Sequence, residues 1–137
     1  MAAAHLMGEV CQRMIKPGNK NTQVTEALGK ICKAYDVTML QGILMHQMKR
    51  FVIDGNKVIL TCNHDTDRVE ECTFEANEVY QVDIALTKGD GKTRAIGTRT
   101  TVFRRNVEET YLLKMKAARS VISEVDARFP VFPFSSR

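Results

Sequence analysis

A single histidine, His46, stands between apolar residues and a Lys-Arg pair in the stretch GILMHQMKRFVIDGNKVIL, residues 42–60. Its imidazole could bind a metal ion, move a proton, or lie in a strand with one ring nitrogen hydrogen-bonded. The first two roles need further ligands, or a titrating partner within hydrogen-bond reach. A lone histidine in an apolar strand more often has the structural role. Asp83, in the strand-like run EVYQVDIAL, is a candidate partner for its ring.

The cysteines offer one further cluster of metal-ligand types, Cys62-Asn63-His64 together with Cys72. A structural zinc site needs four ligands, and two of them usually form a Cys-x-x-Cys pair. The sequence has no such pair and no evident fourth ligand, so we expect free thiols beside a surface histidine. Widely spaced cysteines fit a reducing compartment, and the first residues, MAAAHLMGEVCQR, lack the pattern of a signal peptide. We therefore expect an intracellular protein without membrane insertion.

Charge is unevenly distributed over the 137 residues, whose net charge is +4. Residues 1–60 carry eight Lys and Arg against four Asp and Glu, residues 61–83 carry one against seven, and residues 84–137 carry eleven against five. Such segregation indicates a basic surface that could meet phosphates, although an ordinary solvated surface has the same residue types. The basic candidates are Arg104, Arg105, Lys114, Lys116, Arg119 and Arg128, with Arg94 and Arg99 beside them and Lys49 and Arg50 as weaker ones.

Two helices are expected to precede the strands that carry His46 and Asp83. Apolar residues recur at helical spacing over residues 3–15, and the sequence Lys-Pro-Gly at 16–18 ends that helix. Asn21 or Thr22 can then cap a second helix, which ends near Tyr35.

After the second helix, the sequence pattern becomes that of β-strands. Residues 37–44 and 57–60 are strand-like, and residues 78–86 and 97–103 are expected to pair as a hairpin across a glycine turn at 88–92. Asn106 is expected to open a last helix, whose apolar stripe runs from Tyr111 to Phe129 and ends before Pro130. Phe132 and Phe134 then need a surface to pack on. This order of elements predicts the α+β class.

Five stretches in order resemble one family, over nearly the whole chain: NTQVTEA (21–27), HQMKRFVIDG (46–55), EVYQVDI (78–84), GTRTTVFRR (97–105) and LKMKAARSVISEVDARF (113–129). The chain resembles the proliferation-associated protein family, also called ErbB-receptor-binding proteins. These are non-catalytic relatives of type 2 methionine aminopeptidases, with the pita-bread fold. The resemblance is to the middle part of these longer proteins. It implies a pita-bread portion over residues 1–109, with an antiparallel sheet and helices on one face, and the start of an inserted domain over residues 110–137.

The resemblance also answers the question about His46. Active aminopeptidases of this superfamily hold two metal ions with two Asp, one His and two Glu side chains. By motif match, His46 falls on the histidine ligand and Asp83 on the first glutamate ligand. Lys49 stands where a glycine is expected, and Asp54 stands where a second histidine is expected. The resemblance therefore implies relic ligand positions, with no catalytic residue, no bound metal and no cofactor.

The function implied by the resemblance is that of an adaptor. The inserted domain of the family docks on ribosomal RNA, which places the basic residues of the last helix at an RNA contact. Protein partners would be receptor tails and transcriptional repressors, with roles in translation and growth. The expected localisation is cytoplasmic, with nuclear and nucleolar pools. The rival reading is a fragment of an active dimetal aminopeptidase, and an open sheet edge would also permit self-association of the chain.

Overall fold

The structure is a computed structural model of the chain, and it describes residues 1–63, 68–94, 97–110 and 112–135. His64 of the cysteine cluster and Tyr111 of the apolar stripe lie outside these ranges. Contacts divide the chain into two compact units, Met1–Arg94 and Ala95–Arg137, which we call the first unit and the second unit. Packing alone defines these units, so the expected domain boundary between residues 109 and 110 stays a prediction. Within the described ranges, no helix is long and apolar enough to cross a membrane.

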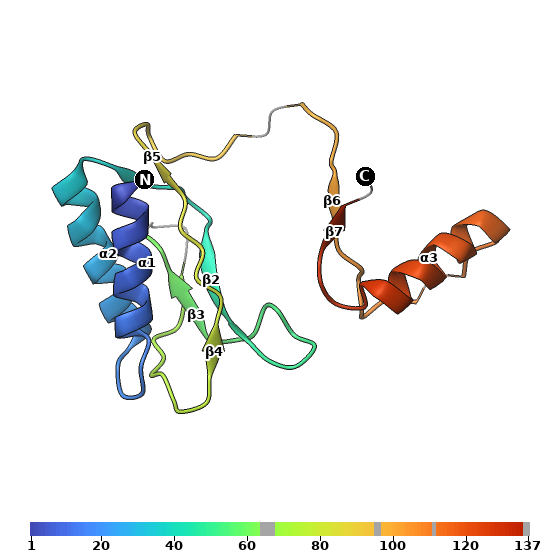
Figure 1. Cartoon of the computed structure of the whole chain (residues 1–137), viewed down its shortest axis with the longest axis horizontal. Coiled ribbons are helices and arrows are strands. Elements are labelled where there is room, and N and C mark those ends of the chain that lie inside the picture. Colours follow the sequence, from blue (N-terminus) through green and yellow to red (C-terminus); the bar gives the residue numbers. More distant parts are fainter. Residues whose placement is uncertain (64–67, 95–96, 111, 136–137) are drawn as a thin grey trace. The chain divides into compact units, whose positions relative to one another are not determined.

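The first unit begins with two helices, and short strands follow (Figure 1). Both helices confirm the predicted ones to within two residues. The elements of this unit in the described ranges are α1 (Ala2–Met14), α2 (Asn21–Tyr35), β1 (Thr38–Met39), β2 (Leu44–Met48), β3 (Val58–Leu60), β4 (Val79–Tyr80) and β5 (Leu86–Thr87).

Strand β2 is the centre of a three-stranded antiparallel sheet with the order β3-β2-β4. His46 lies opposite Val58 of β3, and Gln47 lies opposite Tyr80 of β4. Side chains alternate along a strand, so His46 projects from the face opposite to that of the buried Met45 and Gln47. Strands β1 and β5 form a separate antiparallel pair.

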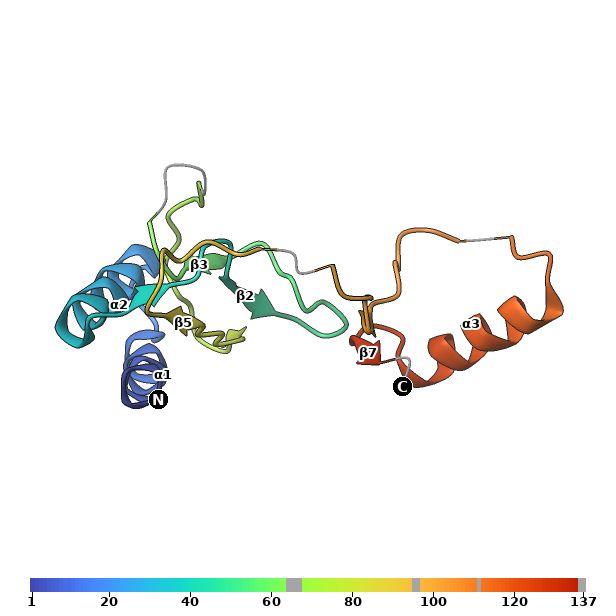
Figure 2. The ribbon, with the colours of Figure 1, turned by 90° about the horizontal axis from the view of Figure 1, so that it is seen from above.

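The core of the first unit lies between the helices and the sheet. Helices α1 and α2 are on the same side of the sheet in both views (Figures 1 and 2). Removal of apolar side chains from water at this contact is the main term that holds the helices to the sheet. The core side chains, each at most 2% exposed, are Met7, Cys11, Val24, Leu28, Met39, Met45, Ile59 and Phe74.

The second unit pairs two short strands and adds one helix, and these elements are β6 (Val102–Phe103), α3 (Lys116–Arg128) and β7 (Phe134–Ser135). The Phe134 ring stacks on Phe129 with ring centres 5.3 Å apart, and it lies 6.3 Å from the ring of Phe103. One of the two terminal aromatic residues therefore packs on its own unit, whereas Phe132 remains 59% exposed.

Three expectations about the secondary structure were wrong. Residues 37–44 do not form one strand, because a turn at residues 41–42 separates β1 from β2. Residues 78–86 and 97–103 do not form a hairpin, because β4 pairs with β2, β5 pairs with β1, and β6 pairs with β7. The last helix begins at Lys116 and not near Asn106. The Asn106 side chain accepts a hydrogen bond from the backbone of Glu108 (3.2 Å), and such a local turn competes with helix formation.

Candidate nucleic-acid interface

The two relic ligand positions, His46 and Asp83, share no hydrogen bond in the structure. The half-buried His46 ring lies in β2, and its Nδ1 is 3.4 Å from the carbonyl oxygen of Gly55. The expected hydrogen bond to Asp83 is not formed. Asp83 is exposed, between β4 and β5. In the described part of the chain, no three His, Cys, Asp or Glu residues gather where they could hold a metal ion. His46 and Asp83 alone cannot supply the five side chains of a dimetal centre, and their assignment as relics stays a prediction.

A carboxylate network that the sequence did not indicate lies beside this strand. Lys57 Nζ is 2.6 Å from Glu78 Oε1 and 2.8 Å from Glu75 Oε1. The same Glu78 carboxylate accepts hydrogen bonds from Gln47 Nε2 (2.9 Å) and from the hydroxyl of Tyr80 (3.1 Å). Only the short spacing between Glu75 and Glu78 could have drawn attention to this group in the sequence, because Lys57 and Gln47 are distant along the chain.

The charges of this network stabilise one another. Hydrogen bonds to Glu75 and Glu78 hold the pKa of Lys57 well above its usual range. Burial acts to raise the pKa of Glu78, but the hydrogen bond from Lys57 and those from Glu75 N–H and Tyr80 outweigh it and lower that pKa. Burial and the hydrogen bond to Glu78 raise the pKa of Tyr80. These charged groups are therefore paired with one another, and they join the residues just before β3 to those just before β4 without offering a reactive group.

Two of the predicted basic contacts already have acidic partners in the second unit. Arg105 forms an ion pair through Nε with Asp126 of α3. Arg128 forms an exposed pair with Glu124, one helical turn away, at 3.4 Å. A guanidinium that is paired within its own chain gains less from a phosphate, because it must first give up that partner. These two arginines are therefore weaker candidates for a phosphate contact than the exposed lysines of the predicted set.

The start of α3 and the segment just before it carry two exposed lysines. Arg119 donates from Nη1 to the carbonyl oxygens of Leu113 (3.2 Å) and Lys114 (3.1 Å), which holds residues 113–114 against the helix. Lys114 and Lys116 are exposed, and neither makes an ion pair with another described residue. The first turn of α3 has no acidic residue, and its N-cap residue, Met115, makes no side-chain hydrogen bond. The positive end of the helix dipole therefore adds to the charge of the lysines.

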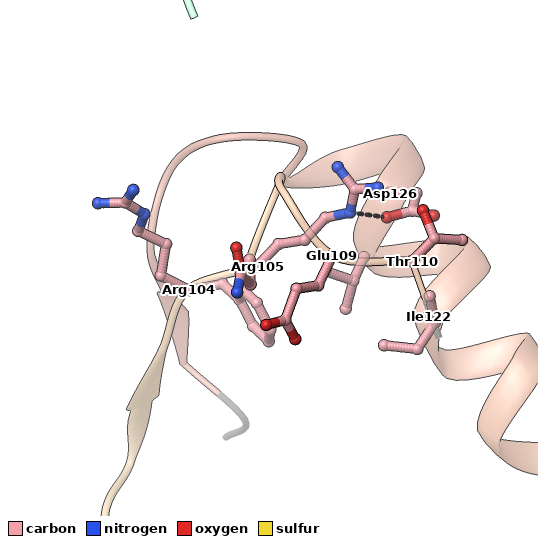
Figure 3. A pocket seen from close by; sticks show the side chains of 9 residues that line it. Arg104, Arg105, Glu109, Thr110, Ile122 and Asp126 are labelled. Carbon is pink, nitrogen blue, oxygen red and sulfur yellow. Dashed lines mark ion pairs between the residues drawn. The ribbon is translucent and has the colours of Figure 1, made fainter. Parts of the chain in front are cut away.

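A pocket of about 360 Å³ lies between α3 and the chain that enters it (Figure 3). Figure 3 shows Arg105 reaching toward Asp126, while the guanidinium of Arg104 points away from that pair. Glu109 and Asp126 add negative charge to the pocket, so it is less suited to a phosphate than the surface at the lysines. Its lining residues are Arg104, Arg105, Asn106, Glu109, Thr110, Ile122, Val125, Asp126 and Phe134.

Comparisons with known proteins agree with the resemblance seen in the motifs, although no family model matches the chain. The chain is 47% identical over 138 residues to ERBB-3 binding protein 1 of Solanum tuberosum and 42% identical over 137 residues to proliferation-associated protein A of Dictyostelium discoideum. It is 41% identical over 140 residues to the curved DNA-binding protein of Schizosaccharomyces pombe. Each match covers the whole chain, which spans 36% of the length of each of these relatives.

The fold is also that of a solved structure. The structure of a thermophilic Arx1 superposes on 97% of this chain and 40% of its own, with a TM-score of 0.78 and 25% sequence identity. Probable metalloprotease ARX1 of Candida albicans is 25% identical over 100 residues. The α+β class and the assignment to part of a pita-bread fold are therefore confirmed, and the relatives are methionine-aminopeptidase-like.

Proposed function

Because the chain belongs to the proliferation-associated protein family, of whose curated members it spans 36%, we propose that it binds structured RNA through the segment that opens α3. The observation that carries this proposal is a pair of exposed lysines at an uncapped helix start: Lys114, whose carbonyl oxygen accepts a hydrogen bond from Arg119, and Lys116, the first residue of α3. Cations fixed on a short rigid element suit the regularly spaced phosphates of A-form RNA, which proteins recognise mainly by shape and backbone. The family resemblance makes ribosomal RNA the first target.

Further support comes from the names of the relatives. One of them is named for DNA binding and others for ErbB-3 binding, so both a nucleic acid and a receptor are partners within the group of relatives. We accordingly propose protein partners, such as receptor tails and transcriptional repressors, beside RNA, together with a role in translation and growth. The proposed localisation is cytoplasmic, with nuclear and nucleolar pools. None of these partners requires a reactive group.

The proposal includes the absence of peptidase activity. A dimetal aminopeptidase of this superfamily should have Glu at position 83, Gly at 49 and His at 54, where this chain has Asp83, Lys49 and Asp54. A lysine ammonium beside the site would repel a divalent cation. Calorimetry with Mn²⁺ and Co²⁺ should show no stoichiometric uptake. Uptake that is lost in both a His46→Ala and an Asp83→Ala variant would revive the enzyme reading.

The RNA proposal is tested by titrating a structured ribosomal RNA fragment with the full chain at two salt concentrations. In the double variant Lys114→Gln, Lys116→Gln, affinity should fall, and the salt slope of log K should become shallower by about one for each lost phosphate contact. The control variant Lys30→Gln, Lys33→Gln removes the same charge from exposed lysines of α2 and should bind normally. Equal losses in the two variants would mean that net charge alone, and not the α3 segment, carries the binding.

A further inference from the structure

The tip of the turn that follows β2 displays an exposed aromatic ring in a backbone conformation that such a residue rarely adopts. Lys49 and Val52 exchange two backbone hydrogen bonds, each 2.9 Å long, so that Arg50 and Phe51 occupy the two corners of a tight turn. The φ angle of Phe51 is +63°, in the left-handed region, where glycine or asparagine is usual and a bulky side chain is strained. The ring is nevertheless 66% exposed, so burial does not compensate for this strain.

The charge around this ring is positive. The guanidinium carbon of Arg50 lies 5.0 Å from the centre of the Phe51 ring, and Lys49 precedes it in the turn. Neither Lys49 nor Arg50 forms an ion pair with any residue in the described ranges. The one carboxylate among the adjoining groove's lining residues, Glu78, already has a cationic partner, because it is paired with Lys57 at 2.6 Å. Two cations and a largely exposed aromatic ring therefore lie together at the tip of this turn.

An open groove of about 530 Å³ adjoins the turn. Lys49 and Arg50 line one part of it, and Asn77 and Val79 line another. Asn77 also has a left-handed backbone (φ 64°), and its exposed side-chain amide makes no hydrogen bond to another residue that the structure describes. An amide offers both a donor and an acceptor, which suits the edge of a base. Val79 is 60% exposed and adds apolar surface to the groove.

We propose that the turn Lys49–Val52 is a second RNA contact, which takes an unpaired nucleotide by stacking its base on Phe51 and placing its phosphate on Lys49 and Arg50. Unpaired bases stack on aromatic side chains and on arginine planes, whereas the bases of a duplex are covered by their neighbours. The proposal rests on RNA being the ligand, but it does not depend on the lysines of α3. It would let the protein distinguish a bulge or loop from a regular helix.

The test compares two RNAs by fluorescence anisotropy with the full chain: a 20-base-pair duplex, and the same duplex with a bulge of three adenosines, one replaced by 2-aminopurine. Phe51→Gly removes the ring, and glycine readily adopts the positive φ of this position. The thermal midpoint of this variant should therefore not fall below that of the native chain. Its affinity for the bulged RNA should fall about 5- to 150-fold, the range of a lost base–aromatic stack, while duplex affinity stays unchanged. Quenching of 2-aminopurine on binding should also disappear.

Two further variants complete the test. Phe51→Trp keeps an aromatic face and should retain binding of the bulged RNA, and Phe132→Ala removes a similarly exposed ring of the second unit and should change nothing. Unchanged binding of bulged RNA by Phe51→Gly would overturn the inference, as would equal losses on both RNAs. If Lys114→Gln, Lys116→Gln has no effect on either RNA while Phe51→Gly weakens only the bulged one, the proposed α3 contact fails and this inference stands.

Discussion

Lys57 and Glu78 form a short ion pair, 2.6 Å between Nζ and Oε1, that joins the chain just before β3 to the start of β4. Lys57 Nζ also donates to the carbonyl oxygen of Thr73 (3.0 Å), and Glu78 Oε2 accepts from the backbone N–H of Glu75 (2.8 Å). The pair therefore fixes the loop that leads into β4. Because β3 and β4 are the two edge strands of the sheet that carries His46, this ion pair links both edges of that sheet.

This pair predicts a specific loss of stability in acid. Folding lowers the pKa of Glu78, so its contribution is present above the ordinary value of 4.5 and is lost as pH falls through the lowered pKa. Glu78→Gln should have a lower thermal midpoint than the native chain at pH 7, and the gap should narrow below pH 4.5. A gap that stays constant from pH 7 to pH 3 would show that the charge of Glu78 does not contribute.

At alkaline pH, Lys57 gives the same ion pair a pH dependence of opposite sign. Folding raises the pKa of Lys57, so its contribution is complete below the ordinary value of 10.5 and is lost as pH rises through the raised pKa. Lys57→Met should lower the thermal midpoint at pH 7, and the gap to the native chain should persist to pH 10.5. Lys30→Met, at an exposed site on α2, is the control and should leave the midpoint unchanged. If the two thermal midpoints became equal below pH 9, the raised pKa of Lys57 would be contradicted.

Asn21 explains why the NTQVTEA motif matters structurally. Its side chain is 4% exposed, donates to the carbonyl oxygens of Val58 and Glu70, and accepts from the backbone of Cys72. Asn21→Ala leaves these buried groups without partners, at a cost of about 1–3 kcal/mol for each that water cannot reach. We expect the free energy of unfolding, measured with urea, to fall by at least ~2 kcal/mol. Asn56→Ala, at an exposed position, should change it by less than about 0.5 kcal/mol.

Gly55 lies against the backbone of β2 and tolerates no side chain. A Cβ atom there would be 2.5 Å from the carbonyl oxygen of Gln47, which also accepts the Gly55 N–H at 2.8 Å. Gly55→Ala should therefore destabilise the chain by about 1–3 kcal/mol in urea unfolding. In contrast, Gly29→Ala in α2 meets no atom within 4 Å and should stabilise the helix by ~1 kcal/mol. Equal effects of the two substitutions would refute this packing argument.

The buried Cys11 thiol should be inert in the folded chain. Its side chain is fully buried, and burial raises its pKa to about 11. At pH 8 roughly one molecule in a thousand would then hold a thiolate, which is the form that reacts. Mass spectrometry after iodoacetamide treatment should show Cys11 unmodified until urea unfolds the chain, with the half-buried Cys72 labelled earlier. Labelling of Cys11 at the rate of Cys72 would mean that the first helix opens readily.

The sequence was informative where the pattern is local. Helices α1 and α2 were predicted to within two residues, because Met7 and Cys11, or Val24 and Leu28, reveal their shared face by spacing alone. The turn signals after them are equally local. The α3 boundary was missed because Asn106 has the residue type of a helix cap but instead closes a short turn with Glu108.

By itself the sequence determined the α+β class, the first two helices and the family, since helical periodicity and ordered motifs need no knowledge of distant contacts. The tertiary structure alone decided which strands pair, because a run such as residues 78–86 is equally suited to several partners until β2 and β1 each take one end of it. It also decided which cations are engaged: Asp126 reaches Arg105, whereas Lys114 and Lys116 have no acidic partner among the described residues. Whether a cation is free to bind a phosphate depends on which acidic side chains lie beside it in the folded chain. Long-range packing decides that, and local sequence does not.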